Sequence, residues 1–237
     1  MTLPVIVLDV DDTLYLEVDF VRSGFRAAGA WLKAEHGVDG LLETAWDLFR
    51  TADRTRVFNL ALEKLCPDAE ADRIKALIEI YRSHRPDIEL APDARRLIET
   101  FRDERLAVIT DGFAETQLRK VEALGLPEYC DPVVRTGVWG RDFWKPHPRA
   151  FRLIQRHYGV EGRDCVYIGD NPAKDFIGAR ALGWRTVRLR REGGLHAETE
   201  AMPGHDADAT IVDLDAILAS PELLQSSSPV AADAVNG

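Results

Sequence analysis

The stretch VIVLDVDDTLY, residues 5–15, places three carboxylates directly after a short apolar run. From Val5 to Val10 every residue except Asp9 is apolar, which is typical of a buried β-strand. Asp11 and Asp12 follow at once, and like charges this close together destabilise one another. The arrangement therefore predicts a bound cation or a chemical role at the end of this strand.

The composition is that of an ordinary globular protein. The 237 residues are 46% hydrophobic and 30% charged, enough for one large domain or two small ones. The net charge is -10, and no dense Lys/Arg stripe is present, so we expect no nucleic-acid partner. The run RLRR at 188–191 is interpreted as a strand end with solvated arginines.

The partners and the compartment follow from what the sequence lacks. No window approaches the ~18 apolar residues of a membrane span, so we expect no membrane partner. The N-terminus shows no cleavable signal pattern, and the three cysteines have no CxxC spacing. We therefore expect a cytoplasmic protein with reduced thiols, present as a monomer or a homodimer.

Short apolar runs rich in Val and Ile indicate buried strands. They lie at 5–9, 106–111, 166–170, 185–189 and 209–213, with a possible sixth at 132–136. Helical patterns separate them, at 93–103, 114–124, 147–158 and 173–182. Because strands and helices alternate, we predict the α/β class, with a three-layer, Rossmann-like parallel sheet covered by helices on both faces.

The interval from Val18 to His84 breaks this alternation, since it contains no good strand pattern. It indicates four amphipathic helices around 18–36, 40–50, 55–65 and 70–84, whose aromatic residues we interpret as their core. We predict a helical cap domain with its return linker at 16–91, inserted after the first strand. The catalytic core then comprises 1–15 and 92–219, and the Ser- and Ala-rich tail at 220–237 is predicted to be disordered.

Three predicted strands end in polar residues, in LDVDDT, ITDG and YIGDNPAKD. The carboxyl ends of parallel strands meet at one edge of a sheet, where ligands of open α/β folds bind. We expect one site there, built from Asp9, Asp11, Asp12, Thr13, Thr110, Asp111, Asp170 and Asp175. So many carboxylates in one crevice need a cation, and hard oxygen ligands without a nearby Cys or a His pair favour Mg²⁺.

At these positions the sequence resembles the haloacid dehalogenase superfamily, whose first motif is D-x-D-x-T after an apolar strand. That motif is matched by Asp9-Val10-Asp11-Asp12-Thr13, and the second by LAVIT ending at Thr110. The third motif, a lysine, is best matched by Lys145 in WKPHPRAF, with Lys174 as its local rival. The fourth is matched by Gly169, Asp170 and Asp175 in IGDNPAKD. The order and spacing agree from residue 5 to about residue 190.

The resemblance implies a role for each residue. Asp9 would be a nucleophile that forms an aspartyl-phosphate, and Asp11 a general acid and base with a raised pKa. The implied Mg²⁺ ligands are Asp9, Asp11 and Asp170, with Thr13 and Asp175 in supporting positions. Thr110, Asp111, Gly112 and Lys145 would bind the phosphate. Many relatives carry Asn where this chain has Asp111, so the role of that carboxylate stays open.

The leading interpretation is a Mg²⁺-dependent phosphatase acting on a small soluble phosphomonoester, such as a nucleotide or a sugar phosphate. The segment TDGFAETQLRKVEALGL, 110–126, resembles the pyrimidine 5'-nucleotidase branch of the superfamily. A phosphomutase shares the same four motifs and stays open. A haloacid dehalogenase would need neither Mg²⁺ nor Asp11, and a non-catalytic phosphoester-binding protein would be expected to lack Asp9 or Asp11.

Overall fold

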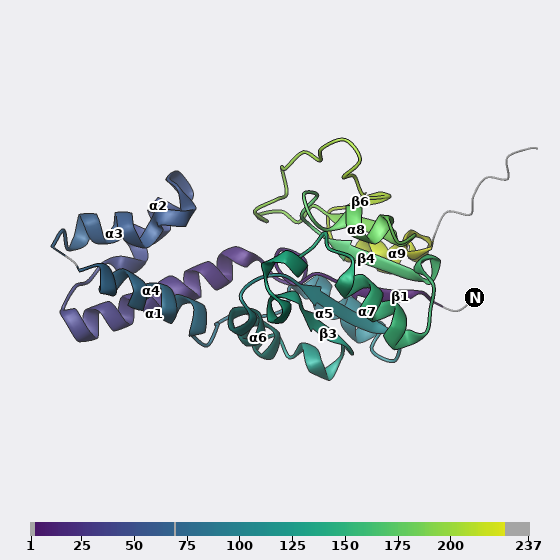
Figure 1. The fold of residues 1–237 in the computed structure, drawn as a ribbon, viewed down its shortest axis with the longest axis horizontal. Helices are drawn as coiled ribbons and strands as arrows, with labels where there is room; N and C mark the ends of the chain where they lie inside the picture. The colour runs from purple at the N-terminus through teal and green to yellow at the C-terminus, as the bar shows by residue number, and fades with distance from the viewer. Residues whose placement is uncertain (1–2, 69, 226–237) are drawn as a thin grey trace, which may run out of the picture.

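The computed structural model describes residues 3–68 and 70–225. Six parallel strands form one sheet in the order β3-β2-β1-β4-β5-β6 (Figure 1). Their bounds are β1 Val5–Leu8, β2 Leu106–Thr110, β3 Val133–Arg135, β4 Cys165–Gly169, β5 Arg185–Leu189 and β6 Ala209–Ile211. Each predicted strand is present, and the prediction of a parallel Rossmann-like sheet is confirmed.

Helices cover both faces of the sheet because the central strand is apolar on both sides. In β1, Ile6 and Leu8 pack into one buried cluster, while Val5 and Val7 pack into another. The first cluster includes apolar residues of α5 (Pro92–Thr100), α6 (Ala114–Ala123) and α9 (Asp215–Ala219). The second includes residues of α7 (Arg149–Tyr158) and α8 (Phe176–Arg180). The result is three layers, with the sheet in the middle.

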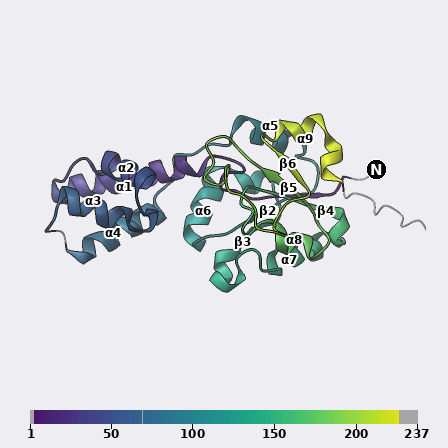
Figure 2. The ribbon, with the colours of Figure 1, turned by 90° about the horizontal axis from the view of Figure 1, so that it is seen from above.

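Four further helices lie between β1 and α5, at the end of the molecule away from α7 and α9 (Figures 1 and 2). They are α1 Glu17–His36, α2 Leu41–Thr51, α3 Val57–Leu65 and α4 Ala71–Ser83. The four predicted helices of the insert are thus confirmed to within about two residues at their ends. Most of their buried residues form a separate cluster, while Phe20 of α1 belongs to the first cluster of the sheet. The predicted aromatic core is present, since Phe25, Phe49 and Phe58 are all buried.

The chain enters and leaves these four helices at neighbouring points. Ala91 lies just before α5, and its backbone N–H donates to the Leu14 carbonyl oxygen at 2.8 Å. The two connections between the sheet and the helices are therefore held side by side. None of the helices in the described part of the chain is long and apolar enough to cross a lipid bilayer.

The predicted tail differs from the structure over its first residues. A 3₁₀ helix spans Pro221–Leu224, and the Leu224 side chain is buried in the first cluster. The apolar pair Leu223 and Leu224 outweighs the polar composition that follows, so the prediction of disorder from 220 is wrong for 221–224. Residues 226–237 of the predicted tail lie outside the described residues.

Candidate active site

The ends of three adjacent strands bring the predicted polar residues together. Asp9 follows β1 directly, Thr110 is the last residue of β2, and Asp170 follows β4. The strands lie in the order β2-β1-β4, so their carboxyl ends meet at one edge of the sheet. All three side chains are buried, with no more than 5% of each residue exposed. The predicted convergence at this edge is therefore present.

A buried lysine lies between two of the carboxylates. The Lys145 Nζ donates to Asp9 Oδ1 at 2.7 Å and to the Tyr167 hydroxyl at 2.6 Å, and it lies 2.8 Å from Asp175 Oδ1. Burial opposes its charge, but Asp175 and Asp9 outweigh burial and hold the pKa of Lys145 well above its usual range. The other Asp175 oxygen accepts from the backbone N–H of Asn171 at 2.8 Å. This set fixes the Asp9 carboxylate.

The three carboxylates of Asp9, Asp170 and Asp175 form one cluster, with ligand oxygens within 4.8 Å of one another. Burial, only partly offset by Lys145, raises the pKa of Asp9 to about 6. Burial and the charges of Asp175 and Asp9 raise the pKa of Asp170 well above its usual range. Within the described residues, Asp170 takes part in no ion pair, whereas Asp9 and Asp175 both pair with Lys145. The cluster is therefore short of positive charge.

Asp11 does not join this cluster. Its Oδ1 accepts from the Tyr15 hydroxyl at 2.5 Å and from Lys120 Nζ at 2.6 Å, and its Oδ2 accepts from Gln117 Nε2 at 3.1 Å. Burial opposes its ionisation, but Lys120, Tyr15 and Gln117 together outweigh burial and lower the pKa of Asp11.

Asp11 differs in two respects from what its predicted roles call for. The acidic side-chain cluster contains Asp175 rather than Asp11, whereas the predicted ligand set is Asp9, Asp11 and Asp170. The pKa of Asp11 is lowered, although its predicted acid role calls for a raised one. The physical reason is the same for both: a buried ammonium on α6 needs a counter-ion, and Asp11 supplies it.

A tight turn after β1 separates the side chains of Asp9 and Asp11. Asp12 has a φ of 53°, in the left-handed region, and its carboxylate accepts from the backbone N–H groups of Glu17 at 2.8 Å and Leu195 at 2.7 Å. Asp12 is thus a structural residue that anchors the start of α1 and a distant loop. Thr13 is fully buried, and its hydroxyl has no hydrogen-bond partner among the described residues.

The loop after β2 lies against the loop after β3. Gly112 has a φ of 140°, and a Cβ atom there would lie 2.8 Å from Gln117 Nε2. A Cβ on Gly137 would lie 2.0 Å from the Gly112 carbonyl oxygen, so both glycines are required by close packing. Thr110 donates its hydroxyl to Gln117 Oε1 at 2.8 Å. Through Gln117, Thr110 is linked to Asp11.

Asp111 contacts neighbouring loops through both of its carboxylate oxygens. Its Oδ1 accepts from the Thr136 hydroxyl at 2.7 Å and from the backbone N–H of Lys145 at 3.1 Å. Lys174 Nζ lies 3.6 Å away from its Oδ2. The carboxylate therefore ties together the loops that follow β2 and β3 and precede α7. Because the Lys145 N–H and Lys174 also approach Oδ2, both oxygens have partners, and the phosphate-binding role of Asp111 stays a prediction.

The arginines of RLRR donate hydrogen bonds to backbone carbonyl oxygens and are not simply solvated. Arg188 is buried and donates to the carbonyl oxygens of His196 at 2.9 Å and Thr199 at 2.6 Å. Arg190 donates to the Ala197 carbonyl at 2.6 Å, and Arg191 donates to the Thr13 carbonyl at 2.8 Å. The interpretation as solvated side chains is wrong, because unpaired loop carbonyls take up the guanidinium donors.

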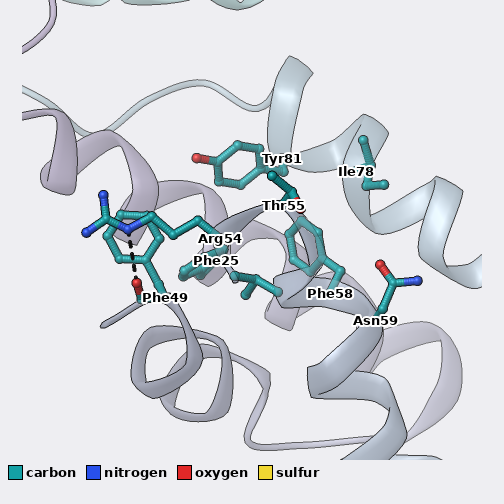
Figure 3. Close-up of a pocket in the computed structure, with 9 residues that line it drawn as sticks. Phe25, Phe49, Arg54, Thr55, Phe58, Asn59, Ile78 and Tyr81 are labelled. Atoms are coloured by element: carbon teal, nitrogen blue, oxygen red, sulfur yellow. Dashed lines mark hydrogen bonds between the residues drawn. The ribbon is translucent and has the colours of Figure 1, made fainter. Parts of the chain in front are cut away.

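A separate hollow of about 120 Å³ lies within α1–α4 (Figure 3). Phe25, Phe49, Phe58 and Tyr81 line it, and their rings pack against one another mostly edge to face. The Arg54 guanidinium lies 4.5 Å from the centre of the Phe49 ring and donates to the Phe49 carbonyl oxygen at 3.2 Å. This hollow is aromatic and carries one cation, unlike the acidic cluster at the sheet edge.

Several contacting residues were not singled out from the sequence. Gln117 and Lys120 lie three residues apart on α6, so both face Asp11. The spacing of the two residues could be seen in the sequence, but the sequence does not show which face of α6 points to the site. Tyr167 lies within β4, where it could not be told from the apolar residues around it.

Comparison with known proteins agrees with this geometry. Residues 3–183 match the family model for haloacid dehalogenase-like hydrolases. The chain is 29% identical to a glyceraldehyde 3-phosphate phosphatase of Methanopyrus kandleri over 222 residues, covering 89% of this chain and 92% of that protein. It is 32% identical to a phosphoserine phosphatase of Thermus thermophilus over 193 residues, covering 76% of this chain and 75% of the relative.

A solved structure extends the likeness to the fold. The crystal structure of a 2-haloacid dehalogenase from Pseudomonas syringae pv. tomato matches with a TM-score of 0.61 and 25% identity. The match covers 94% of this chain and 98% of that one.

Proposed function

We propose that this chain, which belongs to the family of haloacid dehalogenase-like hydrolases, is a Mg²⁺-dependent phosphatase that acts on a small phosphorylated metabolite. The observation that carries the proposal is the buried set at the sheet edge, where Lys145 holds Asp9 beside two further carboxylates. The relatives named as phosphatases of glyceraldehyde 3-phosphate and of phosphoserine support a short phosphorylated substrate.

The residues present fit a divalent cation. Asp9, Asp170 and Asp175 offer three carboxylate oxygens close together, and oxygen donors of this kind suit Mg²⁺. The charge of the cluster supports the same conclusion, since Lys145 pairs with Asp9 and Asp175, and Asp170 has no ion-pair partner among the described residues. Bound Mg²⁺ would offset the repulsion between the anionic Asp9 and an anionic phosphate.

Asp9 is the proposed nucleophile. Its Oδ1 is held by Lys145, which leaves the second oxygen to attack the phosphorus atom. The new bond joins Asp9 to phosphorus, the bond to the leaving oxygen breaks, and water then releases the phosphate. Thr110, Lys145 and the backbone N–H of Gly112 are the proposed phosphate ligands, because they come from the strand and loop ends around Asp9.

Asp11 is the proposed acid and base of the two steps. It lies two residues from Asp9, just beyond the carboxyl end of β1. To reach the leaving oxygen it must exchange its contact with Lys120 for one with the substrate. General acid catalysis is worth about 10²–10⁴-fold in rate.

The four inserted helices are proposed to act as a cap over 16–91 that sets substrate preference. Most of their buried residues form a core of their own, which Phe20 and Tyr81 connect to the first cluster of the sheet, and this supports a distinct cap. At the aromatic hollow of Figure 3, Arg54→Ala should change the ranking among phosphorylated metabolites more than it changes hydrolysis of p-nitrophenyl phosphate. An equal loss on every substrate would count against a selective role.

Asp9→Asn and Asp11→Asn test the assigned roles. Asp9→Asn should abolish turnover, because an amide is a poor nucleophile. Asp11→Asn should slow alkyl phosphates by about 10²–10⁴-fold. With a good leaving group its first step should survive, so that a phosphate adduct accumulates on Asp9. Rapid quench, intact-mass measurement and peptide mapping detect the adduct, and an adduct on another residue would contradict the mechanism.

Two controls complete this experiment. Asp93→Asn removes a buried carboxylate outside the site and should leave turnover nearly unchanged. Phosphate release with and without an added phospho-acceptor separates a phosphatase from a phosphomutase. Release of halide from a 2-haloacid would favour the dehalogenase instead.

A further inference from the structure

Lys120 is a lysine that is buried outside the acidic cluster. Only 2% of the residue is exposed, although α6 otherwise carries its charges at the surface. Its Nζ lies 2.6 Å from Asp11 Oδ1 and 4.2 Å from the centre of the Phe20 ring. A buried ammonium is costly unless it is paired, so this lysine must keep a counter-ion.

A second carboxylate lies near the same ammonium. Glu17 is the first residue of α1, and its Oε1 is 3.9 Å from Lys120 Nζ. Phe20, one turn further along α1, covers the ammonium from the same helix. Lys120 therefore stands between a carboxylate of the sheet edge and a carboxylate of the first inserted helix.

Three side chains donate hydrogen bonds to the Asp11 carboxylate. Tyr15 and Lys120 both bind Oδ1, while Gln117 binds Oδ2 and orients Thr110 with its other end. Of these three, only Lys120 brings a full charge, and charged hydrogen bonds are the stronger ones. The position of Asp11 is thus set mainly by a side chain of α6.

We propose that Lys120 is a positioning residue for Asp11, and that Glu17 competes with Asp11 for the Lys120 ammonium. This rests on the proposed phosphatase function, in which Asp11 acts on the leaving oxygen. Asp11 is the preferred partner at rest, because Coulomb attraction falls with distance and the Asp11 oxygen is nearer. When Asp11 turns to the substrate, Glu17 keeps the buried ammonium paired, so that the turn does not leave an isolated buried charge.

Lys120→Met tests the first half of the proposal. The variant keeps the length of the side chain and removes the charge. We expect kcat/KM for an alkyl phosphate to fall roughly ten- to a hundredfold, since small errors of placement are costly in catalysis. For p-nitrophenyl phosphate, whose leaving group needs little protonation, kcat/KM should fall less than about threefold. Equal losses on both substrates would reduce Lys120 to a structural residue and overturn the proposal.

Two companion variants sharpen this result. Lys120→Arg keeps a cation and should recover part of the alkyl-phosphate activity. Arg119→Met removes the neighbouring cation of α6, whose ion pairs within the described residues are with exposed Glu115 and Glu122, and it should leave both substrates unchanged. If Arg119→Met reproduced the selective loss, the effect would belong to the general charge of α6 rather than to Lys120.

Glu17→Gln, alone and combined with Lys120→Met, tests the competition. In the wild type Glu17→Gln should strengthen the hold of Lys120 on Asp11 and lower kcat/KM for the alkyl phosphate. In the Lys120→Met background the same change should have no such effect. Contacting residues of this kind are expected to show non-additive effects. Additive effects would refute the role of Glu17.

A crystal structure of Lys120→Met separates this inference from the proposed function. The Asp11 carboxylate should leave its contacts with Tyr15 and Gln117 or occupy several positions. If it stays in place with both contacts intact, the inference fails even when the enzyme is an active phosphatase. If the wild type hydrolyses no phosphomonoester, the proposed function fails, and the carboxylate position still decides the inference.

Discussion

Replacing Lys145 by Met should destabilise the protein more than any other single charge removal at the site. The lysine side chain is fully buried, and its Nζ lies within 2.8 Å of Asp9 and Asp175. Removing one partner of a buried pair leaves an uncompensated charge, which typically costs about 3–5 kcal/mol of the free energy of unfolding. Here two carboxylates lose the same partner, so we expect the upper part of that range.

The loss should depend on pH and on Mg²⁺. Burial already raises the pKa of Asp9 to about 6 with Lys145 present, so Asp9 contributes stability at low pH that is lost as pH rises through this value. Without Lys145 the penalty for ionising the cluster is larger, so the difference between wild type and variant should be greater at pH 8 than at pH 5. Mg²⁺ at 100 times its Kd should restore about 2.7 kcal/mol.

Urea unfolding followed by circular dichroism measures these quantities without reference to activity. Lys33→Met is the control, because Lys33 lies far from the cluster in sequence and pairs with Asp39 at 2.7 Å, with both side chains exposed. Solvent screens that pair, so its loss should change the free energy of unfolding little. Equal losses for the two lysines, or a loss below about 1 kcal/mol for Lys145→Met, would refute the electrostatic account of the cluster.

Three further outcomes are expected. Dialysis against EDTA should abolish phosphatase activity and added Mg²⁺ should restore it; full activity in EDTA would exclude the metal. Burial opposes ionisation of Asp93, but Arg191 and two backbone amides outweigh burial and lower the pKa of Asp93. Asp93→Asn should therefore reduce the free energy of unfolding at pH 7. In acid titrations of unfolding, the difference from the wild type should shrink as the pH falls below 3.8, the pKa of the carboxyl in the unfolded chain. Leu224→Ala should cost about 2–5 kcal/mol in urea unfolding, whereas exposed Glu222→Ala should change little; equal effects would mean that the 3₁₀ helix does not dock.

The sheet and the meeting of its polar ends were predictable because both depend on local pattern. A strand such as β1 is apolar on both faces, which only a sheet covered on both sides satisfies. Once the strands are parallel, Asp9 and Asp170 must lie at the same edge. The four inserted helices were predictable for the same reason, since each carries an apolar face of helical period.

The direction of each side chain was not predictable, because it depends on partners distant in sequence. Asp11 turns to Lys120, which lies 109 residues further along the chain. Asp111 turns to Thr136 and the backbone of Lys145. The sequence around these partners does not mark them as contacts. A lysine such as Lys120 cannot be told from a surface lysine until the packing of its helix is known.

The hydrogen bond between Ala91 and the Leu14 carbonyl has a consequence for how this architecture can be altered. It holds the two ends of the four-helix segment next to each other, so the backbone of the sheet follows nearly the same path whether that segment is long, short or replaced. A module with adjacent ends can be exchanged between related chains, or cut out and bridged by a tight turn, without moving the strands. Chimeras joined at Leu14 and Ala91 should therefore fold with the acidic edge unchanged, so that they can be used to test whether substrate preference moves with the exchanged segment.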